Sequence, residues 1–376
     1  MIGLLLLLQV QSADIIVTGP RLVEAQAECA AGGCTPLRDA QASIALAEAQ
    51  FRDGRYVDAK KLLASAITRN RDHAAEAPRA VAALYEAYAT VTLHEGDQDE
   101  YRRAVRHQVD TLRDNLPAGD PSVIAATTAM GDMWVKLGNG RQAAAIYRSL
   151  EKDALDAGQQ RAAMLAGMKV VWLATARSNK SEALRKLDQL EKRPLAADPG
   201  FRIALRVLRL RLAALDADDA SVTALIGELG RSGDAKPLLV SAPPYDLDAV
   251  IAANSAARRF GGPDVVPMGL GSTSSIQWAD IGFWIRPDGR TAEVEILRGS
   301  RSLGWAQPAL DQIGARRYTA SSAADAETSP LGSYRVERFT RKYKYIMQSG
   351  QLVYRRTAIG GFEVIDLTDA PAAPPS

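Results

Sequence analysis

The sequence predicts a multidomain chain in which an α-solenoid is followed by a small α+β module. From about Arg38 to Arg231 the apolar residues recur with the period of a helix, and a glycine turn returns every 42 residues. A segment rich in Pro, Gly and Ser follows, and beyond it apolar and polar side chains alternate with the period of two that a β-strand requires. With 376 residues, the chain is long enough for two or three domains with cores of ordinary size.

The N-terminus predicts export. Residues 1–13 combine the apolar run MIGLLLLLQV with the small residues Ser12 and Ala13, a pattern typical of a secretory signal peptide. The run is shorter than the ~20 apolar residues that span a bilayer, so we expect no integral membrane span. The alternative is that the run stays uncleaved and anchors the chain in the inner membrane.

The cysteines, Cys29 and Cys34, lie in an extended N-terminal segment, residues 14–37. The loop between them contains a pair of glycines, so it is flexible enough to close, and such a pair in an exported protein tends to form a disulfide. A metal site would need further Cys or His residues nearby, and the nearest histidine is His73. We therefore predict a Cys29–Cys34 disulfide and no metal.

A repeat of helix, turn and helix occupies residues 38–232. Its turns fall at Gly54, Gly96 and Gly138, which are 42 residues apart, and weaker copies turn at Ser178 and at Leu215-Asp216. One helical hairpin cannot bury its apolar stripe alone, so neighbouring hairpins stack around one continuous core. The sequence therefore predicts an α-solenoid of about five helical hairpins.

The residues after each turn resemble those of tetratricopeptide repeats (TPR). The matching residues are Gly54, Tyr56, Ala59, Gly138, Ala143 and Tyr147. The resemblance covers about half of the chain and implies antiparallel helix pairs that approach closely at the small alanine. Because the usual period of that family is about 34 residues, the helices here are expected to be longer.

Residues 233–276 are expected to form a linker. They contain Pro237, Pro243-Pro244 and the run GLGSTSS, which are turn and linker residues, and one short helix beginning near Asp246. The run GLGSTSS lacks the lysine of a phosphate-binding loop, so we expect no nucleotide there.

The stretch from Trp278 to Ile285 predicts a strand with one buried face. The inward residues are Ala279, Ile281, Phe283 and Ile285, and the outward residues are Trp278, Asp280, Gly282 and Trp284. A tight turn follows, because proline presets φ and glycine accepts a positive φ; it consists of Pro287, Asp288, Gly289 and Arg290. The returning strand completes a hairpin with three inward residues, Ala292, Val294 and Ile296.

A hairpin alone is marginal in water, so the next segment is expected to cover it with a helix. Ala306, Leu310 and Ile313 are at helical spacing, and Pro308 falls in the first turn, where proline is tolerated. The stretch SYRVERFTRKYKY predicts a strand over residues 333–345, and IMQSGQLVYRR predicts a further hairpin. Residues 346–376 form a C-terminal extension with a Pro-rich, disordered end.

The order strand, turn, strand, helix, strand over residues 277–345 resembles the C-terminal domain of TonB-type energy transducers. The matching residues are 281–285, Pro287 to Arg290, 294–297 and the pair Arg317-Tyr318. The resemblance implies a periplasmic module that binds extended peptides of outer-membrane receptors by adding them as a strand at its sheet edge. We expect that edge to be residues 333–339, with Tyr334, Val336 and Arg338 at the bound peptide.

The chain departs from that family in two ways. The N-terminal run is too short for the membrane helix of an energy transducer. The chain also continues past Tyr345, where its extension is positioned to fill the sheet edge. We therefore expect a periplasmic, non-enzymatic protein–protein interaction scaffold linked to TonB-dependent receptor uptake, whose partner is an envelope protein or an extended receptor peptide. The alternative is an inner-membrane-anchored, energy-transducing subunit of outer-membrane transport.

The segment DIIVTGP, residues 14–20, also resembles the short TonB box of such receptors. The alternative is a terminal stretch that is merely β-prone.

No catalytic residues and no cofactor are predicted. His73, His94 and His107 lie in the helical region, and His94 lacks the second histidine four positions on that a zinc-binding helix carries. With 46 basic and 44 acidic residues the formal charge is +2, so no global field attracts nucleic acid. The basic residues of the 333–345 strand are expected to lie on a solvated face.

Overall fold

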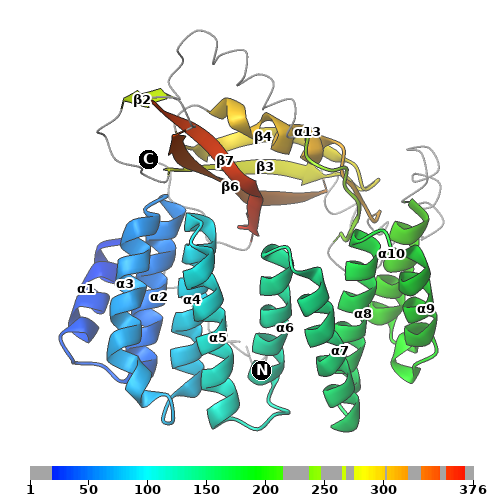
Figure 1. The fold of residues 1–376 in the computed structure, drawn as a ribbon, viewed down its shortest axis with the longest axis horizontal. Coiled ribbons are helices and arrows are strands. Elements are labelled where there is room, and N and C mark those ends of the chain that lie inside the picture. The colour runs from blue at the N-terminus through cyan, green and yellow to red at the C-terminus, as the bar shows by residue number, and fades with distance from the viewer. Residues whose placement is uncertain are drawn as a thin grey trace, which may run out of the picture.

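A computed structural model describes residues 19–214, 237–246, 265–267, 275–300, 303–320, 332–347 and 353–368. A helical domain carries a β-sheet domain on the upper ends of its helices (Figure 1). Several predicted features lie outside these residues: the signal peptide, most of the DIIVTGP segment, the turn at Leu215-Asp216, the helix after Asp246, most of the GLGSTSS run and the Pro-rich end.

Successive helices in the described part of the chain run in opposite directions. Their bounds are α1 Gly19–Ala30, α2 Pro36–Arg52, α3 Tyr56–Asn70, α4 Pro78–Glu95, α5 Gln98–Asn115, α6 Pro121–Lys136, α7 Gly140–Asp156, α8 Gln160–Ala176, α9 Lys180–Glu191 and α10 Pro199–Ala214, with 3₁₀ turns at Arg71–His73 and Pro194–Ala197. Proline begins α2, α4 and α6, where a backbone N–H would have no helical partner. The side chain of Asp120 caps α6 by accepting from the Ser122 amide.

The predicted helix-turn-helix repeat is confirmed. The turn residues Gly54, Gly96 and Gly138 have φ angles of +76°, +94° and +75°, a region that glycine adopts without strain. Ser178 makes the corresponding turn with φ of +56°. The chain therefore reverses at the four predicted positions that the structure describes, and α2–α3, α4–α5, α6–α7 and α8–α9 are antiparallel pairs.

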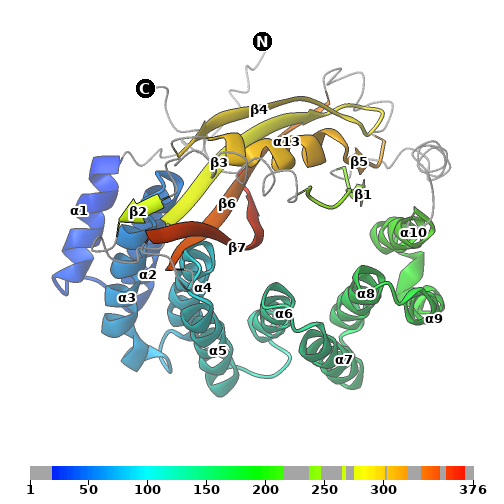
Figure 2. The same cartoon turned by 45° about the horizontal axis from the view of Figure 1, so that its top comes forward.

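These pairs stack into a TPR-like solenoid. Ala59 and Ala143 are completely buried where the helices meet. A Cβ on Gly131 would lie 2.2 Å from the ring of Tyr147, so α6 and α7 approach at a distance that a larger residue would prevent. In Figure 2 the helices α2, α4, α6, α8 and α10 form the inner row of an arc, and α3, α5, α7 and α9 form the outer row. The even-numbered helices therefore line the concave side.

The sheet domain is antiparallel, with strand order β2-β7-β6-β3-β4. Its strands are β2 Val265–Pro267, β3 Ser275–Ile285, β4 Thr291–Gly299, β6 Ser333–Met347 and β7 Val353–Asp366. A second small sheet pairs β1 Leu239–Ser241 with β5 Arg317–Tyr318. The helix α13 Gln307–Gly314 follows a 3₁₀ turn at Leu303–Ala306 and covers one face of the larger sheet.

The predicted hairpin and the buried face of β3 are confirmed. On β4 the expectation for Ala292 is wrong, because a register shift pairs it with the outward-facing Trp284. The inward residues of β3 are completely buried against α13, and they are Ala279, Ile281, Phe283 and Ile285. The outward face differs from the expectation, because Asp280 is only 2% exposed and Trp278 packs against the first helical pair. The helical domain covers this end of the sheet, so both faces of β3 are buried there.

The sheet extends beyond the boundaries expected from the sequence. The segment expected to be a linker contributes β1, β2 and the first residues of β3. The C-terminal extension contributes β7, which pairs with β6, so the further hairpin is confirmed. Phe362 and Val364 of β7 pack against the core of the sheet domain, and this burial makes the extension part of the domain.

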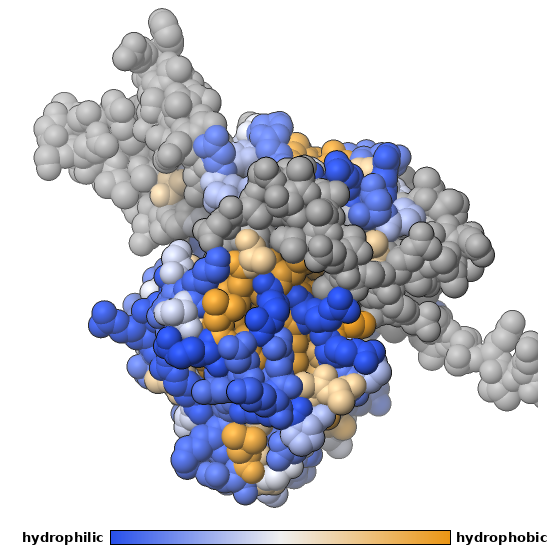
Figure 3. Space-filling view, turned by 90° about the vertical axis from the view of Figure 1, so that its right-hand side faces the viewer, coloured by the Kyte–Doolittle hydropathy of each residue, from blue (hydrophilic) through white to orange (hydrophobic). Residues whose placement is uncertain are grey.

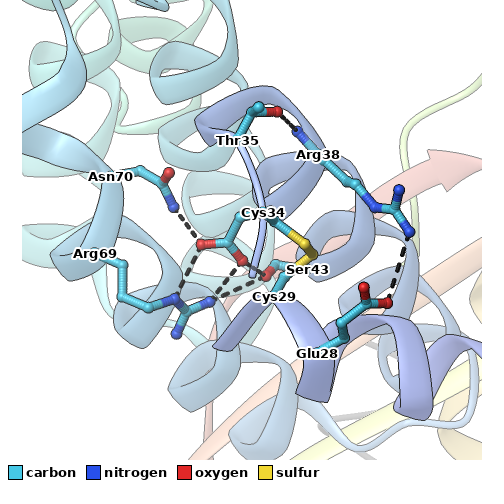
Figure 4. The surroundings of a disulfide bond; sticks show 9 residues. Glu28, Cys29, Cys34, Thr35, Arg38, Ser43, Arg69 and Asn70 are labelled. Atoms are coloured by element: carbon cyan, nitrogen blue, oxygen red, sulfur yellow. Dashed lines mark hydrogen bonds and ion pairs between the residues drawn. A yellow bond between two sulfur atoms is a disulfide. The ribbon is translucent and has the colours of Figure 1, made fainter. Parts of the chain in front are cut away.

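Cys29 and Cys34 form the predicted disulfide, which closes the turn between α1 and α2 (Figure 4). Beside it, the buried carboxylate of Asp39 accepts hydrogen bonds from Arg69 and Asn70 of α3. The disulfide and this carboxylate together hold α1, α2 and α3 as one unit.

Phe283→Ala should destabilise the sheet domain by ~3–5 kcal/mol, because it removes a completely buried aromatic ring. Trp284→Ala, on the opposite and half-buried face, should cost clearly less. Equilibrium urea unfolding of both variants measures the two losses. Equal losses would contradict the assignment of the faces at this end of β3.

Candidate functional site

The sheet domain docks on the turns of the first two repeats. A Cβ on Gly54 would lie 2.2 Å from the indole nitrogen of Trp278, and a Cβ on Gly96 would lie 2.9 Å from Cδ of Lys342. The turn glycines therefore have a second role, because their missing side chains leave room for β3 and β6.

Arg338 of β6 is the centre of this junction. Its Nε donates to Asp280 Oδ1 at 2.6 Å and its Nη2 donates to Asp280 Oδ2 at 2.9 Å. The same guanidinium donates to the carbonyl oxygens of Phe51 and Arg52 at the end of α2, where carbonyls lack a helical partner. The Phe51 oxygen also accepts from the Gly54 amide. It also lies 4.1 Å from the ring centroid of Trp278. Arg338 is 0% exposed, so this network replaces all of its water contacts.

A buried histidine makes the second contact of the junction. The Nδ1 atom of His94 lies 2.8 Å from the Thr340 hydroxyl, and its ring meets Phe51 edge-on. Burial lowers the pKa of His94 to about 3, and the positive charges of Lys136, Lys342 and Arg338 act in the same direction. The imidazole is therefore neutral at physiological pH.

Further contacts connect the sheet to the rest of the solenoid. Glu363 of β7 pairs with Lys136 of α6 at 3.1 Å and with Lys342 of β6 at 3.6 Å. At the other end of the arc, Nε of Arg211 in α10 donates to the carbonyl oxygen of Leu239 in β1 at 3.1 Å. The sheet domain thus reaches from the first repeat to α10, as Figure 2 shows.

An apolar hollow of about 340 Å³ lies between α6, α8 and α10, on the concave side. Trp172 and Leu165 of α8 line it and are 40% and 49% exposed. Its other lining residues are Ile124, Thr128, Ala162, Ala166, Met168, Lys169 and Leu208. Figure 3 views the molecule from the α9 and α10 end and shows a strip of hydrophobic side chains on an otherwise hydrophilic helical surface.

A second hollow of about 560 Å³ lies where α2 and α4 meet the end of β7. Ile44 and Ala87 supply its apolar wall, and Glu48 and Glu86 make one side acidic. Because Ile365 of β7 and Leu367, which follows β7, form part of its lining, the sheet domain already occupies one side of this hollow.

The predicted peptide-binding residues Tyr334, Val336 and Arg338 do not form a free sheet edge. Strand β6 lies between β3 and β7. The amide of Val336 donates to the Thr368 hydroxyl, and its carbonyl oxygen accepts from the Leu367 amide. The C-terminal extension therefore satisfies the backbone groups that an external peptide would need.

The turn motif of Pro287, Asp288, Gly289 and Arg290 has a structural role. Gly289 has φ of +82°, and a Cβ there would lie 2.2 Å from the Tyr318 carbonyl oxygen. Asp288 accepts a hydrogen bond from the Arg290 amide at 2.9 Å. The motif joins β3 to β4 and supports β5.

The sequence analysis missed Trp172, and it considered His94 only as a metal ligand and not as a buried contact to the sheet domain. Trp172 occupies a helical position like those of core residues, and nothing in the pattern indicates that its neighbours leave it exposed. Among the described residues, no group of three or more His, Cys, Asp or Glu is placed to hold a metal ion. In the same part of the chain, no helix combines the length and apolar character needed to cross a membrane.

No protein family model matches the chain, and no curated protein matches it. Among solved structures it is similar to a putative kinesin light chain of Podosopora anserina with nearly identical TPR-like repeats, at 14% identity and a TM-score of 0.41, over 52% of this chain and 94% of that one. It is also similar to BtubC (BKLC) from P. vanneervenii, at 13% identity and a TM-score of 0.44, over 56% and 86% of the two chains. A third is the Rap conjugation gene regulator of the plasmid pLS20 in complex with the Phr* peptide, at 13% identity and a TM-score of 0.36, over 59% and 58%.

Arg338→Met should lower the free energy of unfolding by ~3–5 kcal/mol, because it removes the buried donor of Asp280 Oδ1 and of two helix-end carbonyls. Arg298 stays paired with Asp280 Oδ2 at 2.8 Å in this variant. The control is Arg335→Met on the same strand, whose ion pair with Asp366 is partly exposed and should contribute at most ~1 kcal/mol. Urea unfolding measures both, and hydrogen exchange of the Gly54 region reports on the junction. Similar losses in the two variants would rule out a special role for Arg338.

His94 should make the protein acid-sensitive. Its folded pKa is depressed, so the unfolded chain binds the proton first, and stability present above pH ~6.5 is lost as the pH falls toward ~3. Within that window, protonation of His94 should lower the free energy of unfolding by ~1.4 kcal/mol for each pH unit. His94→Gln should flatten the profile relative to wild type, whereas His73→Gln, at an exposed site, should not. Unfolding curves between pH ~4 and ~6 provide the test, and an unchanged slope in His94→Gln would contradict it.

Proposed function

We propose that this chain is an exported, non-enzymatic scaffold that holds a segment of a partner protein on the concave side of its solenoid. The observation that carries the proposal is the apolar hollow between α6, α8 and α10, where Trp172 and Leu165 remain exposed. Covering large apolar side chains is favourable in water, and exposed apolar surface of this kind marks interaction sites. Repeat solenoids present such concave surfaces for binding.

The chemistry of the hollow favours an apolar segment as its occupant. Its charged group, Lys169, is paired with Asp132 at 2.6 Å, so the charge there is already compensated. Apolar anchor side chains of the partner would therefore supply most of the affinity, with Trp172 as the central contact. A volume of about 340 Å³ suits a few side chains of a bound segment and excludes a folded domain.

The sheet domain supports a finer assignment to the periplasm and to receptor uptake. The order of the β3–β4 hairpin, α13 and β6 corresponds to the TonB-like order expected from the sequence, and a disulfide is consistent with export. Since β7 lies along β6, an extended receptor peptide would have to displace β7 or bind elsewhere. We therefore place partner binding on the solenoid and give the sheet domain a supporting role.

The alternative function, an energy-transducing subunit anchored in the inner membrane, requires that residues 1–13 remain on the mature chain. A mature N-terminus that begins after residue 13 would exclude it.

A photo-crosslinking amino acid at position 172 should capture an envelope protein in intact cells, because that position faces the hollow. Position 57 is the matched control, since Val57 is also exposed but lies on the outer helix α3. Adding Leu165→Glu should strongly reduce the crosslink at 172. The same captured protein from both positions, or no capture at 172, would contradict the proposal.

A further inference from the structure

The junction around Arg338 covers only one end of the sheet face that docks on the solenoid. Trp278, Asp280, Gly282 and Trp284 share this face, because alternate residues of a strand point to the same side. Trp278 and Asp280 take part in the junction, as described above. Trp284 lies beyond them on β3, where its ring centroid is 5.0 Å from that of Tyr334 on β6.

Trp284, Tyr334 and Leu297 form an aromatic platform on this face. Gly282 makes room for it, because a Cβ there would lie 2.1 Å from the Tyr334 hydroxyl oxygen and 3.1 Å from Cδ2 of Leu297. Both rings are half-buried, and Leu297 is 46% exposed. The platform therefore presents ring surface to solvent beside the edge strand β4.

A carboxylate stands next to the platform. Glu295 pairs in register with Gly282, so it lies on the same face, and it is exposed. Burial raises the pKa of Tyr334, and the negative charge of Glu295 raises it further, which places that charge close to the phenol. Within the described part of the chain neither Glu295 nor Glu293 forms an ion pair.

The basic groups of the adjoining turn do not neutralise this carboxylate. Arg290 pairs with Asp288 at 3.9 Å, and Arg286 is exposed at the end of β3. Arg298 on the same face pairs with Asp280 at 2.8 Å. Among the described residues no arginine is paired with Glu295, so its negative charge is the one that lies close to Tyr334.

At the other end of the same face, a tryptophan ring and a carboxylate together bind a guanidinium group. There the guanidinium of Arg338 stacks 4.1 Å from the ring centroid of Trp278 and pairs with the carboxylate of Asp280. Trp284 and Glu295 repeat the tryptophan and the carboxylate without a described arginine between them. A planar guanidinium suits this arrangement because it stacks on a ring and pairs with a carboxylate at the same time.

We propose that the aromatic platform binds an arginine side chain of a partner protein, with the guanidinium stacked on Trp284 or Tyr334 and paired with Glu295. This surface is separate from the concave hollow, so the inference goes beyond the proposed function and does not depend on it.

The test measures the affinity of a fluorescent hexa-arginine peptide for the full chain by anisotropy. Wild type should bind it more tightly than a hexa-lysine peptide, because lysine cannot stack in the same way. Glu295→Gln and Trp284→Leu should each weaken binding by about 2–5-fold, as expected for an exposed ion pair or cation–π contact. Added salt should weaken the wild-type interaction by screening the carboxylate.

Glu24→Gln on α1 is the matched control, because it removes the same charge from an exposed position far along the chain. It should leave the affinity unchanged. Three results would overturn the proposal: equal affinity for the lysine peptide, wild-type affinity in both platform variants, or the same loss in Glu24→Gln. Because Glu295 is exposed, its substitution keeps the test valid if Trp284→Leu proves unstable.

Discussion

The buried pair of Arg338 and Asp280 is the contact on which the arrangement of the two domains depends. Taking both charges out of water is costly, and it is offset only when every donor finds an acceptor. Asp280 supplies two of these acceptors from the sheet, whereas the carbonyls of Phe51 and Arg52 supply the others from α2. Because the acceptors come from both domains, the guanidinium is satisfied only in the docked state. The contact between the two domains therefore contributes to the free energy of folding of the whole chain.

A docked sheet also fixes the shape of the solenoid. Stacked helical repeats contact only their neighbours, so an isolated array bends easily. Here Glu363 holds α6 through Lys136, and Leu239 holds α10 through Arg211, while Arg338 holds the first repeat. Contacts at three points along the arc limit its change of curvature. The concave hollow is consequently formed before a partner arrives, which lowers the conformational cost of binding.

The sequence predicted the features that depend on local chemistry. A glycine with a positive φ marks three of the repeat turns, and alternation along β3 marks its buried face, so Gly54 and Phe283 were placed correctly. The sequence indicated that the extension past Tyr345 could fill the edge of β6, but it did not predict the length and register of β7, because the residues of β7 carry no periodic signal of their partner. Arg338 was expected on a solvated face for a related reason. Alternation shows which side a charge lies on, but only the docked helices show that this side is buried.

The protection of β4 and β6 against strand addition favours exposed side-chain faces over these two strands as sites for a partner. An unpaired edge invites strand addition unless it is short, bulged or charged. Strand β7 covers β6, whereas the edge strand β2 pairs only with Val353 to Arg355 of β7 in the described part of the chain. The other edge, β4, carries a register shift and has Glu293 at φ of +50°, which interrupts a regular ladder. Strand addition is therefore restricted at β4 and β6, and the side chains that stay open to a partner include the rings of Trp172 on the solenoid and of Trp284 on the sheet.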